Sequence, residues 1–172
     1  MGKKIMDGKE IREILKKAAM TIEKEMGLSD TVIIGIRRRG AVLADRLKEA
    51  FSRKDVPVGY LDITLYRDDF SKIGAHPVVS ETDVLFNIDD KNILLVDDVL
   101  FTGRTIRAAL DALVDLGRPA VVRLFVLVDR GHRELPVSAD FSGKQVKTLM
   151  NEMVEVKLKE IDGRDEVLVE KK

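Results

Sequence analysis

The chain of 172 residues contains no cysteine and no tryptophan, and it has only two histidines. Without thiols, disulfide scaffolds, cysteine-ligated zinc and thiol catalysis are excluded. With so few imidazoles, a histidine-rich metal site is not expected. No apolar run approaches the ~18–20 residues that a membrane-spanning helix needs, and no apolar segment follows the basic N-terminus as it would in a signal peptide. We therefore expect a soluble, cytoplasmic protein that contacts no membrane.

An excess of charge of one sign is also lacking, because 30 Lys and Arg residues balance 30 Asp and Glu residues. Proteins that bind nucleic acid by general attraction carry a net positive charge over the domain. The balance disfavours that class and leaves only a local basic patch. The length is typical of one domain, since ~100–200 residues per domain is usual. We expect residues 1–172 to form a single domain.

Hydrophobic periodicity predicts helices that alternate with strands apolar on both faces. The first helix has a stripe of apolar residues, and Asp7 with Glu10 resembles a capping box. The expected elements are helix 7–27, strand 31–36, helix 42–51, strand 58–66, strand 93–96, helix 105–116 and strand 120–128. This order indicates an α/β fold with a central, mainly parallel sheet flanked by helices.

Two segments do not fit the alternation. Residues 67–91 are polar and long for a connection, which predicts a flexible lid loop, in which residues 78–79 and 84–86 could pair as a short hairpin. Near the C-terminus, apolar residues alternate over 154–158 and 167–169, on either side of a turn at Asp162-Gly163. The tail therefore predicts a small C-terminal strand region, or hood.

The segment Ile93–Thr105 carries the strongest chemical signal. Asp97 and Asp98 follow a buried strand, and a turn with glycine and two threonines then leads into a helix N-terminus. Ligands of open α/β sheets bind at the carboxyl ends of strands, and a helix N-terminus attracts phosphate. Carboxylates beside a phosphate-binding loop suit a sugar phosphate, whose hydroxyls donate to the acids.

This segment resembles the phosphoribosyl-pyrophosphate (PRPP) signature of the type I phosphoribosyltransferases. The resemblance implies the fold of that family, with Asp97 and Asp98 on the ribose hydroxyls and the following loop on the 5′-phosphate. The residues that it implies for binding PRPP or its product here are Asp97, Asp98, Val99, Leu100, Phe101, Thr102, Gly103, Arg104 and Thr105.

A second loop, Gly35–Gly40, has P-loop glycine spacing, but Ala41-Val42 follow where a Walker A loop has Lys-Ser/Thr. Its three consecutive arginines suit either an exposed basic turn or a pyrophosphate, whose oxygens pair with guanidinium groups. The family resemblance favours the second interpretation. It implies that Arg38, Arg39 and Gly40 face the leaving group, and that Arg39 acts with the two aspartates in catalysis.

Segments 62–69, 111–119 and 126–136 resemble a narrower branch, the pyrimidine-operon attenuation regulators, and the resemblance runs over essentially the whole chain. Members bind operon leader mRNA in response to UMP or UTP, and often convert uracil and PRPP to UMP and pyrophosphate. The resemblance implies Mg²⁺ bound with PRPP, with or without help from the two aspartates, and no metal site made by protein side chains alone. It also implies a homo-oligomer, a dimer or a tetramer.

The same resemblance assigns further residues. It adds Arg130 to the substrate site, and Tyr66 and Arg67 to the lid as pyrophosphate contacts. The residues that it implies for RNA binding are Lys16, Lys17, His132, Arg133 and Lys144. The chain departs from the regulators at Met20 and Ser138, where basic or polar side chains are expected. The alternative is a plain phosphoribosyltransferase for uracil or another base, such as hypoxanthine, without RNA binding.

Overall fold

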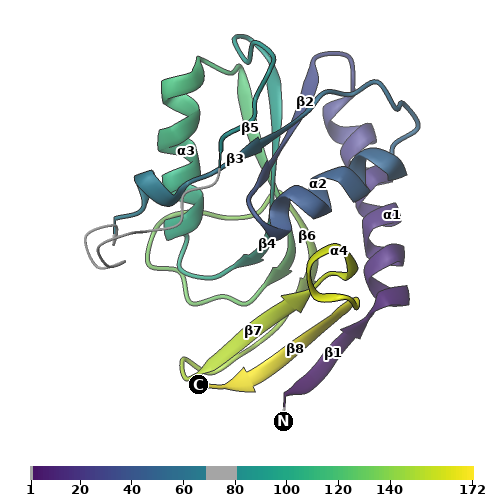
Figure 1. The fold of residues 1–172 in the computed structure, drawn as a ribbon, viewed down its shortest axis with the longest axis vertical. Helices are drawn as coiled ribbons and strands as arrows, with labels where there is room; N and C mark the ends of the chain where they lie inside the picture. The colour runs from purple at the N-terminus through teal and green to yellow at the C-terminus, as the bar shows by residue number, and fades with distance from the viewer. Residues whose placement is uncertain (1, 69–80) are drawn as a thin grey trace.

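The computed structural model describes residues 2–68 and 81–172, which form one five-stranded and one three-stranded sheet (Figure 1). The large sheet has the order β3-β2-β4-β5-β6 and is parallel throughout; the small one has the order β1-β8-β7 and is antiparallel. The elements are β1 (Lys3–Asp7), α1 (Gly8–Met26), β2 (Thr31–Ile36), α2 (Arg39–Ala50), β3 (Val58–Leu61), the 3-10 helix η1 (Thr64–Tyr66), β4 (Asn92–Leu100), α3 (Arg104–Leu116), β5 (Val121–Asp129), β6 (Phe141–Gln145), β7 (Glu152–Lys157), α4 (Lys159–Asp162) and β8 (Glu166–Lys171).

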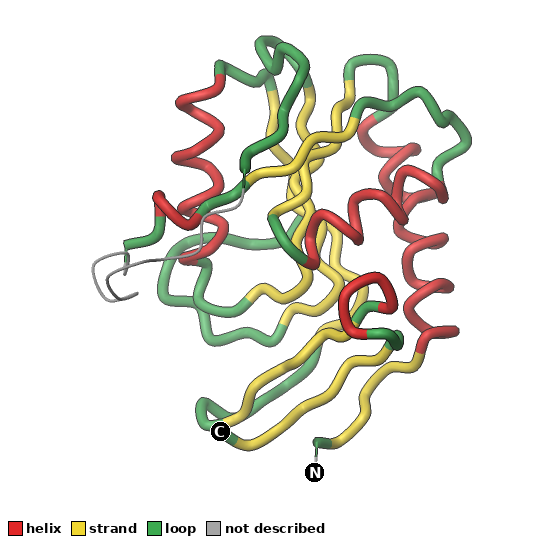
Figure 2. Tube along the Cα trace, in the orientation of Figure 1, coloured by secondary structure: helices red, strands yellow, loops and turns green. Residues whose placement is uncertain are grey.

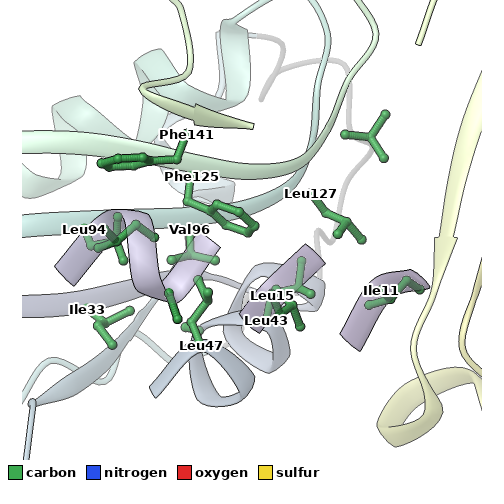
Figure 3. Packing of buried hydrophobic residues seen from close by; sticks show 14 of the residues in the cluster. Ile11, Leu15, Ile33, Leu43, Leu47, Leu94, Val96, Phe125, Leu127 and Phe141 are labelled. Carbon is green, nitrogen blue, oxygen red and sulfur yellow. The ribbon is translucent and has the colours of Figure 1, made fainter. Parts of the chain in front are cut away.

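Helices cover both faces of the large sheet, α1 and α2 on one and α3 on the other (Figure 2). Successive side chains of a strand point to opposite faces, so each buried strand feeds two cores. Leu94 packs with the core under α1 and α2, and Leu95 with the core under α3. Figure 3 shows the first core, where Ile11 and Leu43 from the helices belong to the same cluster as Ile33 from the sheet. No helix in the described part of the chain is long and apolar enough to cross a membrane.

The first helix begins as the sequence predicts. The Asp7 side chain accepts from the Glu10 backbone N–H at 2.9 Å, and the Glu10 side chain accepts from the Asp7 N–H at the same distance. This reciprocal capping box satisfies two donors that the helix leaves unpaired. The prediction of the helix start is therefore confirmed.

Two strand predictions need correction, and two strands were not predicted. The strand expected over 58–66 ends at Leu61, and residues 64–66 form η1 instead. The strand expected over 93–96 runs on through both aspartates to Leu100, because β5 continues to pair with it as far as Asp129. The strands β1 and β6 were not predicted. Both are short, and β1 gains its pairing from β8 at the other end of the chain.

The predicted C-terminal hairpin is present, but its connection is longer than a two-residue turn. The short helix α4 links β7 to β8, and Gly163 ends it with φ +75°, a left-handed conformation that glycine adopts without steric cost. Of the predicted lid hairpin, residues 78–79 lie outside the described residues. Residues 84–86 form no strand, and the described pairing nearby is a single bridge between Tyr60 and Asp83.

Candidate active site

The chain reverses its direction of travel across the large sheet between β2 and β4. After β2 it moves outward to β3, and it then returns to form β4 on the other side of β2. Ligands of open α/β sheets bind at such a switch point, outside the carboxyl ends of the two strands. The arginine loop follows β2 and the aspartate pair ends β4, so sheet order alone brings the two predicted motifs together.

A cavity of about 270 Å³ lies at this point. Its lining combines basic groups from the loop after β2 with acidic groups from β4. The lining residues are Ile36, Arg37, Arg38, Arg39, Ile63, Arg67, Asp97, Asp98, Val99 and Thr105. The structure therefore gathers six of the thirteen predicted PRPP-binding residues around one cavity, together with Arg67 from the predicted lid.

Two glycines allow the first turn of α2 to approach the strands closely. A Cβ atom on Gly35 would lie 2.6 Å from the Cα of Ala41, and one on Gly40 would lie 2.5 Å from the carbonyl oxygen of Val96. Either distance is a severe clash with the backbone. Gly40, which was predicted to face the leaving group, is buried. The absence of a side chain at this position allows α2 to pack closely against β4.

Asp97 and Asp98 form a tightly coupled pair. The Asp97 carboxylate accepts from the backbone N–H of Asp98 at 2.9 Å, and the Asp98 carboxylate accepts from the N–H of Val99 at 2.8 Å. Burial and the neighbouring Asp98 charge raise the pKa of Asp97 well above its ordinary value, and burial raises the pKa of Asp98 as well. Two adjacent carboxylates with raised pKa values favour a partner that donates hydrogen bonds or carries positive charge.

The three arginines of the loop after β2 differ in their partners. Arg37 donates to the carbonyl of Glu81 at 2.7 Å and lies over the Tyr60 ring, 5.2 Å from its centroid. Arg38 is exposed. Arg39 donates to Asp162 at 2.9 Å, while its Nε is buried without a partner among the described residues. The peptide bond between Arg37 and Arg38 is cis.

The loop that joins β4 to α3 has the shape of an anion-binding turn. Gly103 has φ +92°, which places the α3 N-terminus directly after the turn, and Thr105 lines the cavity. Arg104 points elsewhere, since it forms ion pairs with Asp68 and Glu134. Leu100 and Gly103 are buried, and the Leu100 carbonyl accepts from the Arg130 N–H at 3.0 Å.

Arg130 does not line this cavity in the described structure. Its guanidinium stacks on the Phe101 ring, 4.0 Å from the centroid, and donates to Thr148 Oγ1 and to the carbonyl of Leu149, each at 3.1 Å. His132 touches Thr148 and Phe101 as well, with its Nε2 2.7 Å from the Thr148 carbonyl oxygen. This cluster ties the loop after β4 to the segment after β6.

The five residues predicted to bind RNA are spread over three elements. Lys16 and Lys17 are exposed on α1. Lys144, on β6, donates to the carbonyl of Ile5 at 2.7 Å. Arg133 joins its own loop to the loop after β4, since it donates to Phe101, Val137 and Asp129; those oxygens lie 2.7, 2.9 and 2.6 Å away.

Tyr66 also has a partner away from the cavity, because its hydroxyl donates to Asp115 on α3 at 2.7 Å. Among the described residues, no group of three or more His, Cys, Asp or Glu side chains is placed to hold a metal ion. Asp97 and Asp98 supply two oxygen donors of the kind Mg²⁺ prefers. They fit a metal ion only if a ligand supplies the remaining oxygens.

Two residues that contact predicted site residues could not be predicted from any motif or periodicity in the sequence. Asp162 comes from α4, 123 residues after Arg39, and was taken as part of a turn. Thr148 receives both Arg130 and His132 from a segment without any regular pattern. Each contact depends on how the C-terminal region folds back.

The fold and the cavity together define a phosphoribosyltransferase. Residues 1–161 match the family described as phosphoribosyl transferase domain. A hypoxanthine phosphoribosyltransferase structure from Staphylococcus aureus shares the fold, with a TM-score of 0.73 at 17% identity over 96% of this chain and 90% of that one. The expected type I phosphoribosyltransferase fold is therefore confirmed.

Two curated relatives are much more similar to the chain. Bifunctional protein PyrR of Chloroflexus aurantiacus is 54% identical over 97% of this chain and 94% of its own length. Bifunctional protein PyrR of Ligilactobacillus salivarius is 52% identical over 99% of both. The chain belongs to the PyrR family, as its sequence predicts.

Proposed function

We propose that the chain transfers the phosphoribosyl group of PRPP to uracil, which gives UMP and pyrophosphate, and that it also binds pyrimidine-operon leader mRNA when UMP or UTP is bound. The observation that carries the proposal is one cavity that holds a carboxylate pair and an arginine loop, in a chain of the PyrR family. Residues 1–172 are proposed to act as one domain.

In this proposal, each side of the cavity binds a different part of the substrate. Asp97 and Asp98 accept from the ribose hydroxyls, and the turn that begins α3 donates backbone N–H groups to the 5′-phosphate. Arg38 and Arg39 pair with the pyrophosphate oxygens. As pyrophosphate leaves, positive charge develops on the sugar, and the buried carboxylates stabilise it without reorganising. Because positioning and charge do this work, Asp97, Asp98 and Arg39 are the proposed catalytic residues.

Mg²⁺ is the proposed cofactor and binds with PRPP. It would be held by pyrophosphate and ribose oxygens, with Asp97 and Asp98 as the protein donors. When bound, it neutralises charge on the departing phosphates. Tyr66 and Arg67 are proposed to contact pyrophosphate, and Tyr66 must leave Asp115 to do so. Arg130, stacked on Phe101, is proposed to act on the substrate through the loop after β4.

RNA is proposed to bind across α1, β6 and the loop after β5, where Lys16, Lys17, His132, Arg133 and Lys144 lie. We also propose a homo-oligomer, a dimer or a tetramer. Large apolar side chains that a partner subunit could cover are exposed on the described surface, with Met20 73% and Val114 74% exposed.

Two assays test the proposal. Labelled uracil, guanine, hypoxanthine and orotate are each incubated with PRPP and Mg²⁺, and uracil should be turned over best. Filter binding to a pyrimidine-operon leader hairpin should show tighter binding with UMP or UTP than with PRPP, because ligands that favour different states shift a linked equilibrium differently. Binding no tighter than to a scrambled hairpin contradicts the regulatory half.

The second candidate is a plain phosphoribosyltransferase for uracil or another base. It is favoured by one observation: Arg133 and Lys144 donate to oxygens of their own chain and are only half exposed. Turnover of uracil without any hairpin binding would select this candidate.

A further inference from the structure

Helix α2 carries two arginines on one face, Arg39 in its first turn and Arg46 two turns later. Both pair with acids of the C-terminal segment. Arg39 donates to Asp162 at 2.9 Å, and Arg46 reaches Asp165 at 2.7 Å and Glu160. The short helix α4 accordingly lies next to the beginning of α2 (Figure 1). The small sheet is thereby fastened to the helix that starts at the active-site cavity.

The ion pairs of Arg39 and of Arg46 differ in their surroundings, because the two arginines line different cavities. Arg39 lines the cavity with Asp97 and Asp98; burial raises the pKa of Asp98, and the charge of Arg39 opposes part of that rise. Arg46 lines the groove between α1 and α2, away from the two aspartates. Arg39 is therefore part of the cavity wall, and Asp162 contacts it there, whereas the Arg46 pairs only fasten the C-terminal segment.

The Asp162 carboxylate is itself held in place through its second oxygen. Oδ2 accepts from the backbone N–H of Leu158 at 2.8 Å, and Leu158 is fully buried. Oδ1 is left for Arg39. Burial opposes ionisation of Asp162, but the hydrogen bonds from Leu158 and Arg39 outweigh it and keep its pKa below the ordinary value. Arg39 thus has a charged and rigidly anchored partner.

We propose that Asp162 is a positioning residue for pyrophosphate: it fixes the Arg39 guanidinium so that the remaining N–H groups of Arg39 face the leaving group. A guanidinium has five N–H donors, and Asp162 receives one of them in the structure. An arginine held in its binding rotamer loses less conformational freedom when the ligand arrives. This inference rests on the proposed function, because it assigns the arginine loop to pyrophosphate.

The test compares Asp162→Asn with the matched control Asp165→Asn by calorimetry with inorganic pyrophosphate and with UMP. Asparagine has an NH₂ donor in place of one carboxylate oxygen, so the separate contacts of Oδ1 with Arg39 and of Oδ2 with Leu158 cannot both be kept. D162N should bind pyrophosphate about tenfold more weakly and UMP within about twofold of wild type. D165N breaks an Arg46 contact in the same segment, and it should change neither affinity more than about twofold.

A double-mutant cycle separates positioning of Arg39 from general damage to the segment. If Asp162 acts through Arg39, then R39A/D162N should bind pyrophosphate as weakly as R39A alone. Additive losses, equal losses for D162N and D165N, or D162N binding like wild type would each overturn the inference. Wild-type protein that fails to bind pyrophosphate refutes the proposed function itself, and the inference with it. Asp162→Ser, which keeps one acceptor oxygen, replaces D162N in the cycle if thermal unfolding shows that D162N does not fold.

Discussion

Two loops at the same edge of the large sheet look alike in sequence and differ in what their side chains contact. Both follow buried strands, and both are rich in charge. Near the carboxyl end of β4, Asp97 and Asp98 accept from neighbouring backbone N–H groups and contact each other, and they line a cavity. After β5, Arg130 and Arg133 donate to oxygens of their own chain. The charged side chains near the end of β4 remain available to a ligand. The arginines after β5 are instead engaged with oxygens of neighbouring segments of the protein.

The comparison teaches that charge at a strand end does not by itself mark a binding site. Asp97 has a raised pKa, and Arg39 has a buried Nε without a partner among the described residues, so both store unfavourable free energy that a ligand can relieve. Arg133 has three acceptors within 2.9 Å, and its contacts are complete without any ligand. Ligand-binding groups are those that the fold leaves unsatisfied.

The largest effect is expected for Asp98→Asn. It should lower PRPP-dependent turnover by at least about a hundredfold, because a neutral amide neither accepts from two hydroxyls nor stabilises developing positive charge as well. Turnover of labelled uracil measures this. Asp111→Asn, at an exposed acid on α3, is the matched control and should be neutral. A folded D98N variant of near wild-type activity contradicts the ribose assignment.

Arg39→Ala should weaken PRPP and pyrophosphate by roughly ten- to a hundredfold, and UMP much less. Losing a charge-assisted pair costs about 1.5–3 kcal/mol, and UMP lacks the pyrophosphate that this loop is proposed to bind. Calorimetry with the three ligands checks it. Arg107→Ala, at an exposed arginine on α3, is the control. Equal losses of affinity for PRPP and for UMP would show that the loop does not bind the pyrophosphate group.

Arg133→Ala should lower stability by about 1–3 kcal/mol, since it removes a donor from the carbonyl oxygens of Phe101 and Val137. For a chain of this size, Tm should fall by roughly 2–4 °C for each kcal/mol. Thermal unfolding is the measurement, again with Arg107→Ala as the control. An unchanged Tm would mean that the loop after β5 is as free as the loop after β4, and it would remove the contrast between them.

Replacing Lys16 and Lys17 together by Ala should weaken binding of the leader hairpin without lowering Tm, because both side chains are exposed. Each lost phosphate contact should make the salt dependence shallower by about 0.9 in log–log slope, if a duplex-like value holds. Filter binding at several salt concentrations measures the slope. The exposed Lys147→Ala on the segment after β6 serves for comparison. An unaltered slope would remove α1 from the proposed RNA surface.

The smallest effect is a gain in stability. Asp97→Asn should stabilise the ligand-free protein by about 1 kcal/mol near neutral pH. Because the pKa of Asp97 is raised in the folded state, ionisation disfavours folding. That cost is absent below the ordinary carboxyl pKa and grows as pH rises towards the folded-state pKa. The gain in Tm should therefore vanish in acid, and an equal gain at pH 4 and pH 8 would assign it to packing instead.

Local patterns were enough to predict several features. The Asp7 and Glu10 capping box, the apolar strands and the Ile93–Thr105 motif each depend on neighbours along the chain, so their geometry follows from the order of residues. The parallel sheet follows from alternating strands and helices. The end of β4 was misplaced because two aspartates look like a turn, whereas pairing with β5 extends the strand through them.

The sequence by itself determined the family, the parallel sheet and the two motifs of the cavity, since each is written in a short run of residues with a fixed spacing. Only the tertiary structure decided which charged side chains remain available to a ligand. In the sequence, Arg133 and Asp162 look like ordinary surface residues. In the structure, Arg133 donates to Asp129, and Asp162 accepts from Arg39, which is distant along the chain. The physical reason is that a hydrogen bond between distant segments depends on how the whole chain packs, and no local pattern records it.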